Sequence, residues 1–323
     1  EKNETHRDNL IDIINKIDST YTRLHENLKA KQKIIIFFDP AHGKLPDGRW
    51  QGGDATLRSS CTNRPEEFYS IIISRALYSY LKKNPHFEVK STDDFMDVLE
   101  GDSDSYDNIP FSTTVDLAKK YNAFILLSEH LNNVSVLYKA SGKMNIPGIH
   151  VINGRGGVKI LNHIKSTYSG FLTLYNKLDA SGFSRKYALN LKSNLTALGM
   201  KPNSWDFGAV GDSRFSYFVD FPVSIIYESG FISNPTEEKQ LRDPEFVDKL
   251  AGAQYQSLLD TIREIYSVDI SGKTSVESKT PPPSMELFKL SRMAVYYLKE
   301  ADTPKVVEII NTMQKLYGGA GNI

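Results

Sequence analysis

Two histidines and two glutamates have the residue types of a catalytic metal site. His42 and His130 each follow or end a short apolar run, Glu228 ends a third such run, and Glu66 opens an amphipathic helical pattern. Two neutral imidazoles and one carboxylate are a common catalytic zinc set, which leaves a fourth position for water. The other carboxylate would be the general base, because zinc lowers the pKa of its water to about 7.

No local motif supplies these groups together. The HExxH motif of zinc peptidases is absent, because His25-Glu26 is followed by Lys29 where the second histidine would stand. The candidates lie far apart in the sequence, which fits a site assembled from several strand ends. A loop histidine without a role remains the alternative for His42, and an ordinary acid of a first helical turn remains the alternative for Glu66.

Three apolar runs predict the buried strands that would position these groups. The runs cover residues 33–39, 123–130 and 222–228, and they lack the alternation of a strand with one solvated face. Helical patterns separate them, so we expect an α/β fold with a mainly parallel sheet flanked by helices on both faces. Ligands and catalytic groups of such sheets collect at the carboxyl ends of the strands.

A helix that begins near Pro65 is expected to present Glu66. Proline suits a first helical position. Stepping back by three residues from Tyr69 leads to Glu66, which therefore points toward the core, whereas Glu67 is turned about 100° away. The helix dipole favours an ionised carboxylate in this first turn. The expected apolar face of the helix comprises Tyr69, Ile72, Ile73, Ala76, Leu77, Tyr80 and Leu81.

Further elements follow from periodicity and capping residues. Ser112 and Ser184 are expected to cap the helices that they precede. The expected elements are a strand at 87–91, an acidic loop at 93–107, helices at 112–121, 184–199 and 244–266, a strand at 148–152 and a mainly helical segment at 157–180.

Both ends of the chain differ in character from its middle. Residues 1–31 predict an N-terminal amphipathic helix with a heptad-like seam, packed either on its own domain or in a coiled coil. Residues 32–266 form the expected catalytic domain. The stretch 267–284 is polar and proline-rich, as linkers are, and residues 285–323 predict a helical hairpin appendage.

Composition argues against several classes of protein, and the first residue bears on processing of the chain. Lys+Arg and Asp+Glu are balanced at 39 each, which argues against a nucleic-acid binder. No apolar run approaches the roughly 20 residues of a membrane span. The single Cys61 excludes an internal disulfide and a cysteine-based zinc cluster. Because the chain begins at Glu1, we expect that a signal peptide has been removed.

Four segments occur in the order typical of a known family. On these segments, residues 33–266 resemble the zinc-dependent N-acetylmuramoyl-L-alanine amidases of bacterial cell walls, of the amidase-3 type. Asp39-Pro-Ala-His-Gly43 matches the family's D-P-G-H-G, Glu66 its helix-opening glutamate, Leu127–Asn132 its I-S-x-H-x-N, and Tyr227–Pro235 its V-E-x-G-F-I-S-N-P.

The resemblance implies a site and a reaction. His42, Glu66 and His130 would be the ligands of one catalytic Zn²⁺, and Glu228 would be the general acid/base. The bond cleaved would join the lactyl group of N-acetylmuramic acid to L-Ala of the peptide stem. Asn132, close to the second histidine, is expected to contribute to substrate binding.

Some positions depart from the family pattern. Ala41 replaces a usual glycine and Lys44 a glycine-like position. Arginines common in the family are replaced at residues 92–93, which are Thr-Asp, and at residues 113–114, which are Thr-Thr. These departures concern contacts with the substrate more than the zinc ligands.

The resemblance also suggests regulation and location. Activator-controlled members carry a helix that covers the zinc, so we expect residues 157–180 to be such a lid; a surface insertion is the alternative. A protein activator would act on this segment or on the terminal helices. The expected partner is peptidoglycan, and the expected setting is the periplasm or cell envelope, with a role in cell-wall biogenesis, degradation and cell division.

Two other functions stay open at this stage. A zinc peptidase would cut within the stem peptide instead of at its attachment to the sugar. A non-catalytic peptidoglycan-binding or scaffold protein would keep the fold and work through its helical ends. The presence of all four candidate residues argues against the second of these readings.

Overall fold

The computed structural model describes most of the expected catalytic domain. The helix expected at 1–31 and the hairpin expected at 285–323 lie outside the described residues, as does most of the linker at 267–284. The described residues are 32–39, 42, 45, 47, 59–101, 106–133, 168–179, 181–203, 208–212, 221, 223–266 and 270–271, with the backbone of strands at 136–139, 151–153 and 158–161.

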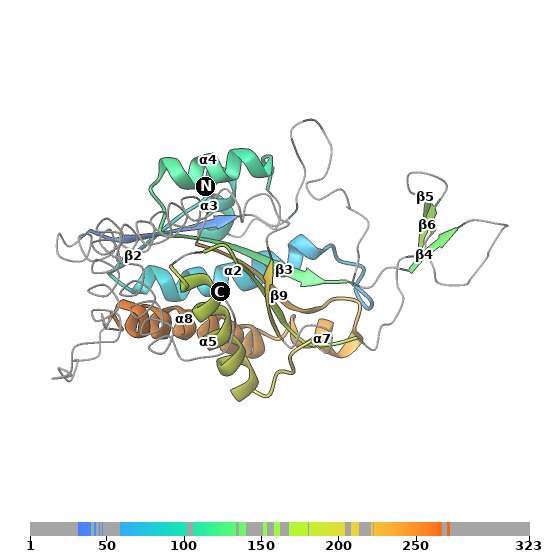
Figure 1. The fold of residues 1–323 in the computed structure, drawn as a ribbon. Helices are drawn as coiled ribbons and strands as arrows, with labels where there is room; N and C mark the ends of the chain where they lie inside the picture. The colour runs from blue at the N-terminus through green and yellow to red at the C-terminus, as the bar shows by residue number, and fades with distance from the viewer. Residues whose placement is uncertain are drawn as a thin grey trace, which may run out of the picture.

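A six-stranded sheet forms the centre of the described domain, in the order β2-β1-β3-β9-β7-β8 (Figure 1). Neighbouring strands are parallel except at the β7–β9 contact, which is antiparallel. The mainly parallel sheet expected from the sequence is thus confirmed. The strands are β1 Ile34–Asp39, β2 Phe87–Lys90, β3 Ile125–Asn132, β7 Leu172–Asn176, β8 Ala209–Asp212 and β9 Ser224–Phe231.

Helices cover both faces of this sheet, as Figure 1 shows. Helices α2, α5 and α8 pack together on one face, and α4 lies on the other. Among the described helices, none is long and apolar enough to cross a membrane. The helices are α2 Glu66–Lys83, α3 Asp93–Glu100, α4 Phe111–Lys120, α5 Phe183–Ala197, α7 Pro235–Gln240 and α8 Pro244–Tyr266.

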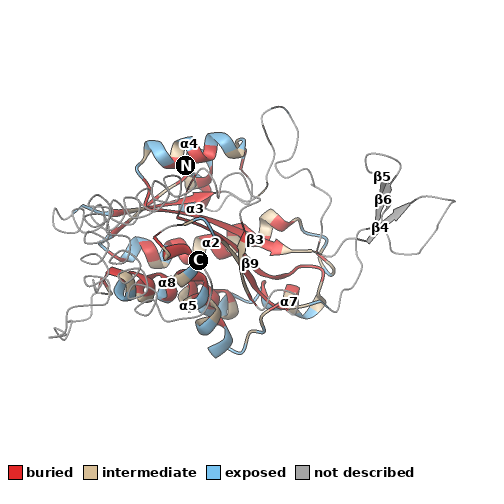
Figure 2. Ribbon diagram, in the orientation of Figure 1, coloured by how far each residue is buried: buried red, intermediate tan, exposed pale blue. Residues whose placement is uncertain are grey.

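The unbroken apolar runs are explained by two cores, one on each face of the sheet. Phe38 and Leu127 belong to the larger core with α2, α5 and α8, whereas Phe37 and Leu126 belong to the smaller core with α4. Figure 2 shows the central strands as almost entirely buried. Because successive side chains point to opposite faces, a strand covered on both sides needs apolar residues at every position.

The prediction of a mainly helical segment at 157–180 is wrong. The structure has β6 (Val158–Leu161) and β7 there. Strand β6 pairs with β4 (Val136–Lys139) and β5 (Val151–Asn153) in a small antiparallel sheet, whereas β7 belongs to the main sheet. Val158 and Ile160, like Leu172 and Leu174, repeat with the period of two that characterises strands.

One expected loop and one expected helix cap also differ in the structure. The acidic stretch at 93–107 contains α3, whose start is capped by Thr92 Oγ1 accepting from the Phe95 amide at 3.3 Å. Acids in a first helical turn are favoured by the helix dipole, so the charges that suggested a loop instead begin a helix. Ser112 does not cap α4, because that helix begins one residue earlier, directly after Pro110.

The remaining element boundaries agree more closely. Helix α8 spans Pro244–Tyr266 as expected, and β2 begins at Phe87. The strand expected at 148–152 corresponds to β5, which begins at Val151, and the residues before it lie outside the described part. The prediction that Ser184 caps this helix is wrong, because α5 starts after Gly182 and Ser184 lies within it. The Oγ atom of Ser184 accepts from the Ser224 amide at 3.2 Å.

Candidate metal centre

Three neighbouring strands bring the candidate groups to one edge of the sheet. Strand β1 pairs in parallel with β3, and β3 pairs in parallel with β9, so their carboxyl ends meet. His130 lies near the end of β3, directly opposite Glu228 in the register of β9. His42 follows the end of β1 in a left-handed conformation, with φ of 58°. A non-glycine residue in that region is unusual and is often found at functional sites.

Helix α2 contributes Glu66 from its first residue. Glu66 is buried, whereas Glu67 is partly exposed, as the helical spacing from Tyr69 predicts. The amide of Leu131 donates to Glu66 Oε1 at 2.9 Å and so joins the start of α2 to the end of β3. Tyr69, Ile73, Leu77 and Leu81 of the predicted face are buried, while Ile72, Ala76 and Tyr80 are only partly so.

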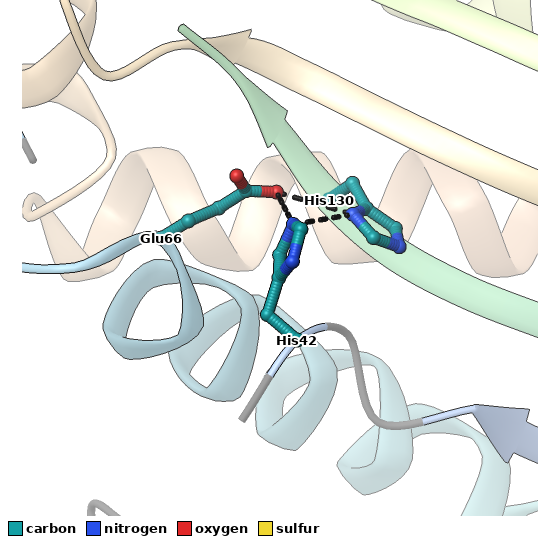
Figure 3. A group of neighbouring side chains, drawn as sticks. All are labelled: His42, Glu66 and His130. Atoms are coloured by element: carbon teal, nitrogen blue, oxygen red, sulfur yellow. Dashed lines mark hydrogen bonds and ion pairs between the residues drawn. The ribbon is translucent and has the colours of Figure 1, made fainter. Parts of the chain in front are cut away.

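The three expected metal ligands converge, as Figure 3 shows. His42 Nε2 and His130 Nδ1 each lie 3.1 Å from Glu66 Oε1, and the two nitrogens lie 3.2 Å apart. A tetrahedral site with bonds of about 2.0–2.1 Å has edges of about 3.3 Å between its ligand atoms. The nearly equilateral triangle therefore has the dimensions that a zinc-sized cation requires.

The protonation states of this triangle also suit a cation. Burial alone would raise the pKa of Glu66, but the two adjacent histidines outweigh burial and lower it to about 2. Burial lowers the pKa of His130, which favours the neutral imidazole. An ionised carboxylate and a neutral imidazole are the forms that bind metals.

Glu228 is the second carboxylate of this edge and has the opposite environment. Burial, followed by the charge of Glu66, raises its pKa well above the usual range. Its Oε2 is buried and has no hydrogen-bond partner among the described residues. Glu228 is not part of the convergent group of possible ligands. A carboxyl group whose pKa is raised in this way holds a proton more readily than an ordinary glutamate, which suits general acid–base chemistry.

Asn132 lies at the end of β3, where the β3–β9 register shifts after His130. Its carbonyl accepts from the Ile232 amide at 2.9 Å, which joins β3 to the segment after β9. Its Nδ2 is buried without a partner among the described residues. An unused donor is compatible with the substrate contact expected of Asn132, which stays a prediction.

Asp39, at the end of β1, is a buried acid of this edge to which the sequence analysis assigned no role. Its Oδ2 accepts from Ser128 Oγ at 3.0 Å, across the β1–β3 pairing. Burial raises its pKa to about 7, despite the lowering effect of Ser128. The sequence signals for Asp39 were its place at the end of an apolar run and at the start of the D-P-G-H-G match, and neither distinguishes structural support from chemistry.

Comparison with known proteins agrees with this arrangement. The sequence model of the Amidase_3 family, described as N-acetylmuramoyl-L-alanine amidase, matches residues 36–260. That range includes both histidines and both glutamates of the site. No curated protein matches the chain.

Several solved structures share the fold. An N-acetylmuramoyl-L-alanine amidase from Clostridium difficile 630 is 19% identical with a TM-score of 0.50, covering 71% of this chain and 97% of its own. The amidase Ami1 from Mycobacterium smegmatis is 17% identical with a TM-score of 0.51, covering 71% and 96%. Apo Ami1 from Mycobacterium abscessus is 16% identical with a TM-score of 0.50, covering 71% and 98%. At these identities the likeness establishes the fold alone.

Proposed function

The chain belongs to the N-acetylmuramoyl-L-alanine amidase family Amidase_3, and from this we propose that it is a zinc-dependent peptidoglycan hydrolase. The bond cleaved is the amide between the lactyl group of N-acetylmuramic acid and L-Ala of the stem peptide. The observation that carries the proposal is the triangle of His42, Glu66 and His130 with Glu228 on the neighbouring strand.

His42, Glu66 and His130 would hold the zinc ion. Their donor atoms converge to 3.1–3.2 Å, and two imidazoles with one carboxylate form a common catalytic zinc set. A bound zinc ion supplies Lewis acidity, which acidifies water and stabilises negative charge on a carbonyl oxygen. The Leu131 amide would hold Glu66 in orientation from outside the ligand set.

Glu228 would move the proton. Its carboxylate accepts a proton from the attacking water as the new C–O bond forms, and then gives that proton to the amine nitrogen as the C–N bond breaks. The raised pKa suits both halves of this exchange, because a base of very low pKa would not retain the proton. Among the described residues, Glu228 Oε2 has no hydrogen-bond partner, so this oxygen is available to accept the proton.

The partners and setting are part of the proposal. The substrate would be peptidoglycan, the compartment the cell envelope or periplasm, and the process cell-wall remodelling such as that of cell division. A removable lid at 157–180 is not supported, because β7 within it pairs with β9, the strand of Glu228. A protein activator would instead act on residues outside β7 or on the terminal segments.

A zinc peptidase remains the second candidate reaction, because the same ligand set serves both. Metal content and activity on purified peptidoglycan test the proposal together. We expect about one zinc ion per chain and release of stem peptides that is lost on chelation and restored by zinc. A zinc-free protein that binds peptidoglycan without cleaving it would instead show the non-catalytic binding function.

A further inference from the structure

Glu238 is a fully buried carboxylate outside the catalytic set. It lies in α7, just beyond the strand that carries Glu228, and its oxygens accept hydrogen bonds from a segment about 170 positions earlier in the chain. Its donors are Ser60 Oγ at 3.1 Å, the Cys61 amide, the Thr62 amide at 2.9 Å, Thr62 Oγ1 at 2.7 Å and the Tyr69 hydroxyl at 2.8 Å.

These donors lie on both sides of Glu66. Thr62 precedes Glu66 by four residues, and Tyr69 follows it by three, so one carboxylate holds the chain before and after the expected metal ligand. The contact with Tyr69 comes from the same face of α2 as Glu66, because residues three apart in a helix share a face.

The loop at residues 59–64, which Glu238 holds, is closed by hydrogen bonds between its two ends and is joined to the segment directly after β9. The Ser59 amide donates to the Arg64 carbonyl at 2.9 Å, and the Arg64 amide donates to Ser59 Oγ at 3.0 Å. The Ser60 amide donates to the Ile232 carbonyl at 2.9 Å, directly after β9. The loop is therefore fixed relative to the sheet edge where Glu228 lies.

Helix α2 has no side-chain cap of its own. Its N-cap is Pro65, which makes no capping hydrogen bond. The first helical residue is nevertheless Glu66, the residue whose oxygen must meet two histidines. The start of this helix is held instead by the hydrogen bonds that Glu238 accepts from Thr62, before the helix, and from Tyr69, within it.

We propose that Glu238 is a positioning residue for the metal centre, which holds the start of α2 so that Glu66 meets His42 and His130. The inference rests on the proposed ligand set. Burial alone would raise the pKa of Glu238, but its hydrogen bonds, with Thr62 first among them, lower it to about 2, so the anchor is ionised at neutral pH. Losing a group hydrogen-bonded directly to a metal ligand typically weakens metal binding about 10–100-fold. Glu238 acts one step further out, through the chain on both sides of Glu66, so an effect near the lower end of that range is expected.

Asp179 provides a matched control at the opposite edge of the sheet. It accepts from the Ser181 amide at 2.9 Å and the Ser184 amide at 2.8 Å, and so anchors the loop before α5. Strand β7 runs antiparallel to β9, so this loop lies at the edge away from Glu228. Among the described residues, α5 carries no member of the candidate site.

The experiment measures zinc affinity by chelator competition, and the visible spectrum of the cobalt-substituted protein, for the full chain and its variants. For Glu238→Gln we expect zinc binding weakened about tenfold or more and a changed cobalt spectrum. Asp179→Asn should stay within about twofold of wild type in zinc affinity, with an unchanged spectrum, even where it lowers the melting temperature equally.

Equal weakening in Asp179→Asn would overturn the inference, because the effect would then follow general stability. Wild-type affinity and spectrum in Glu238→Gln would also overturn it. Should Glu238→Gln not fold, Tyr69→Phe decides: it removes one donor, and a wild-type cobalt spectrum would contradict the inference. Failure of the ligand set itself would appear separately, as absence of tight zinc binding in the unmodified chain.

Discussion

The start of α2 and the end of β9 place two carboxylates at one sheet edge in opposite electrostatic settings. Glu66 lies between two histidines, which lower its pKa to about 2 although it is buried. Glu228 is surrounded by buried groups and the negative charge of Glu66, and its pKa rises well above the ordinary range. The same residue type is thus suited to hold a cation in one place and to exchange a proton in the other.

The largest effect is expected from removing one histidine of the proposed metal site. His42→Ala or His130→Ala removes one vertex of a triangle whose edges are 3.1–3.2 Å. We expect loss of stoichiometric zinc and of nearly all peptidoglycan hydrolysis in both variants, because two ligands hold zinc poorly. Metal analysis after gel filtration checks this, and full zinc occupancy in both variants would remove these histidines from the ligand set.

The second prediction separates proton transfer by Glu228 from zinc binding by the other three residues. Glu228→Gln should retain zinc at the wild-type stoichiometry while kcat falls about 10²–10⁴-fold, the usual contribution of a general acid–base group. Turnover and metal content are measured on the same preparation. A variant that loses zinc would show that Glu228 is a ligand, and one with wild-type kcat would exclude it from proton transfer.

A third prediction concerns acid stability of the metal-free protein. Because the pKa of Glu238 is lowered from 4.5 to about 2, its contribution to stability is present above pH 4.5 and is lost as the pH falls toward 2. Urea unfolding followed at several pH values in this window should show a shallower decline for Glu238→Gln than for wild type. Parallel curves for the two proteins would contradict the assigned environment.

The smallest expected effect sharpens the choice between neighbouring glutamates. Glu67 is partly exposed and is not part of the convergent triangle, whereas Glu66 is buried. Glu67→Gln should change zinc affinity by less than about twofold, because Glu67 is not a proposed ligand. Glu66→Gln weakens a vertex of the triangle and should lose stoichiometric zinc, as the histidine variants do. Zinc titration of both variants decides, and a reversed order would reassign the ligand.

The parts predicted correctly depend on local pattern. The apolar runs of β1, β3 and β9 reveal strands buried on both faces, and the helical spacing from Tyr69 places Glu66, not Glu67, on the buried face of α2. The missed helix α3 carries acids in its first turn, which suggested a loop. Strand β7 has too few residues to outweigh the helical reading of the longer segment around it.

Other features could not be read locally because they depend on contacts distant in sequence. Glu238 meets Thr62 and Tyr69 only after the sheet has formed, across separations of 176 and 169 positions. The left-handed conformation of His42 could likewise not be predicted locally, because histidine adopts that region only in a small fraction of cases. Sequence pattern therefore indicated the candidate groups that the fold brings together, whereas the residues that support them could be found only in the folded chain.

The most direct test is mass analysis of the products that the zinc-loaded protein releases from purified peptidoglycan. The account predicts stem peptides that begin with a free L-Ala amine, together with glycan strands that keep an intact lactyl carboxylate. Peptides cut between residues of the stem, with L-Ala still attached to the sugar, would contradict the amidase assignment and establish a zinc peptidase instead.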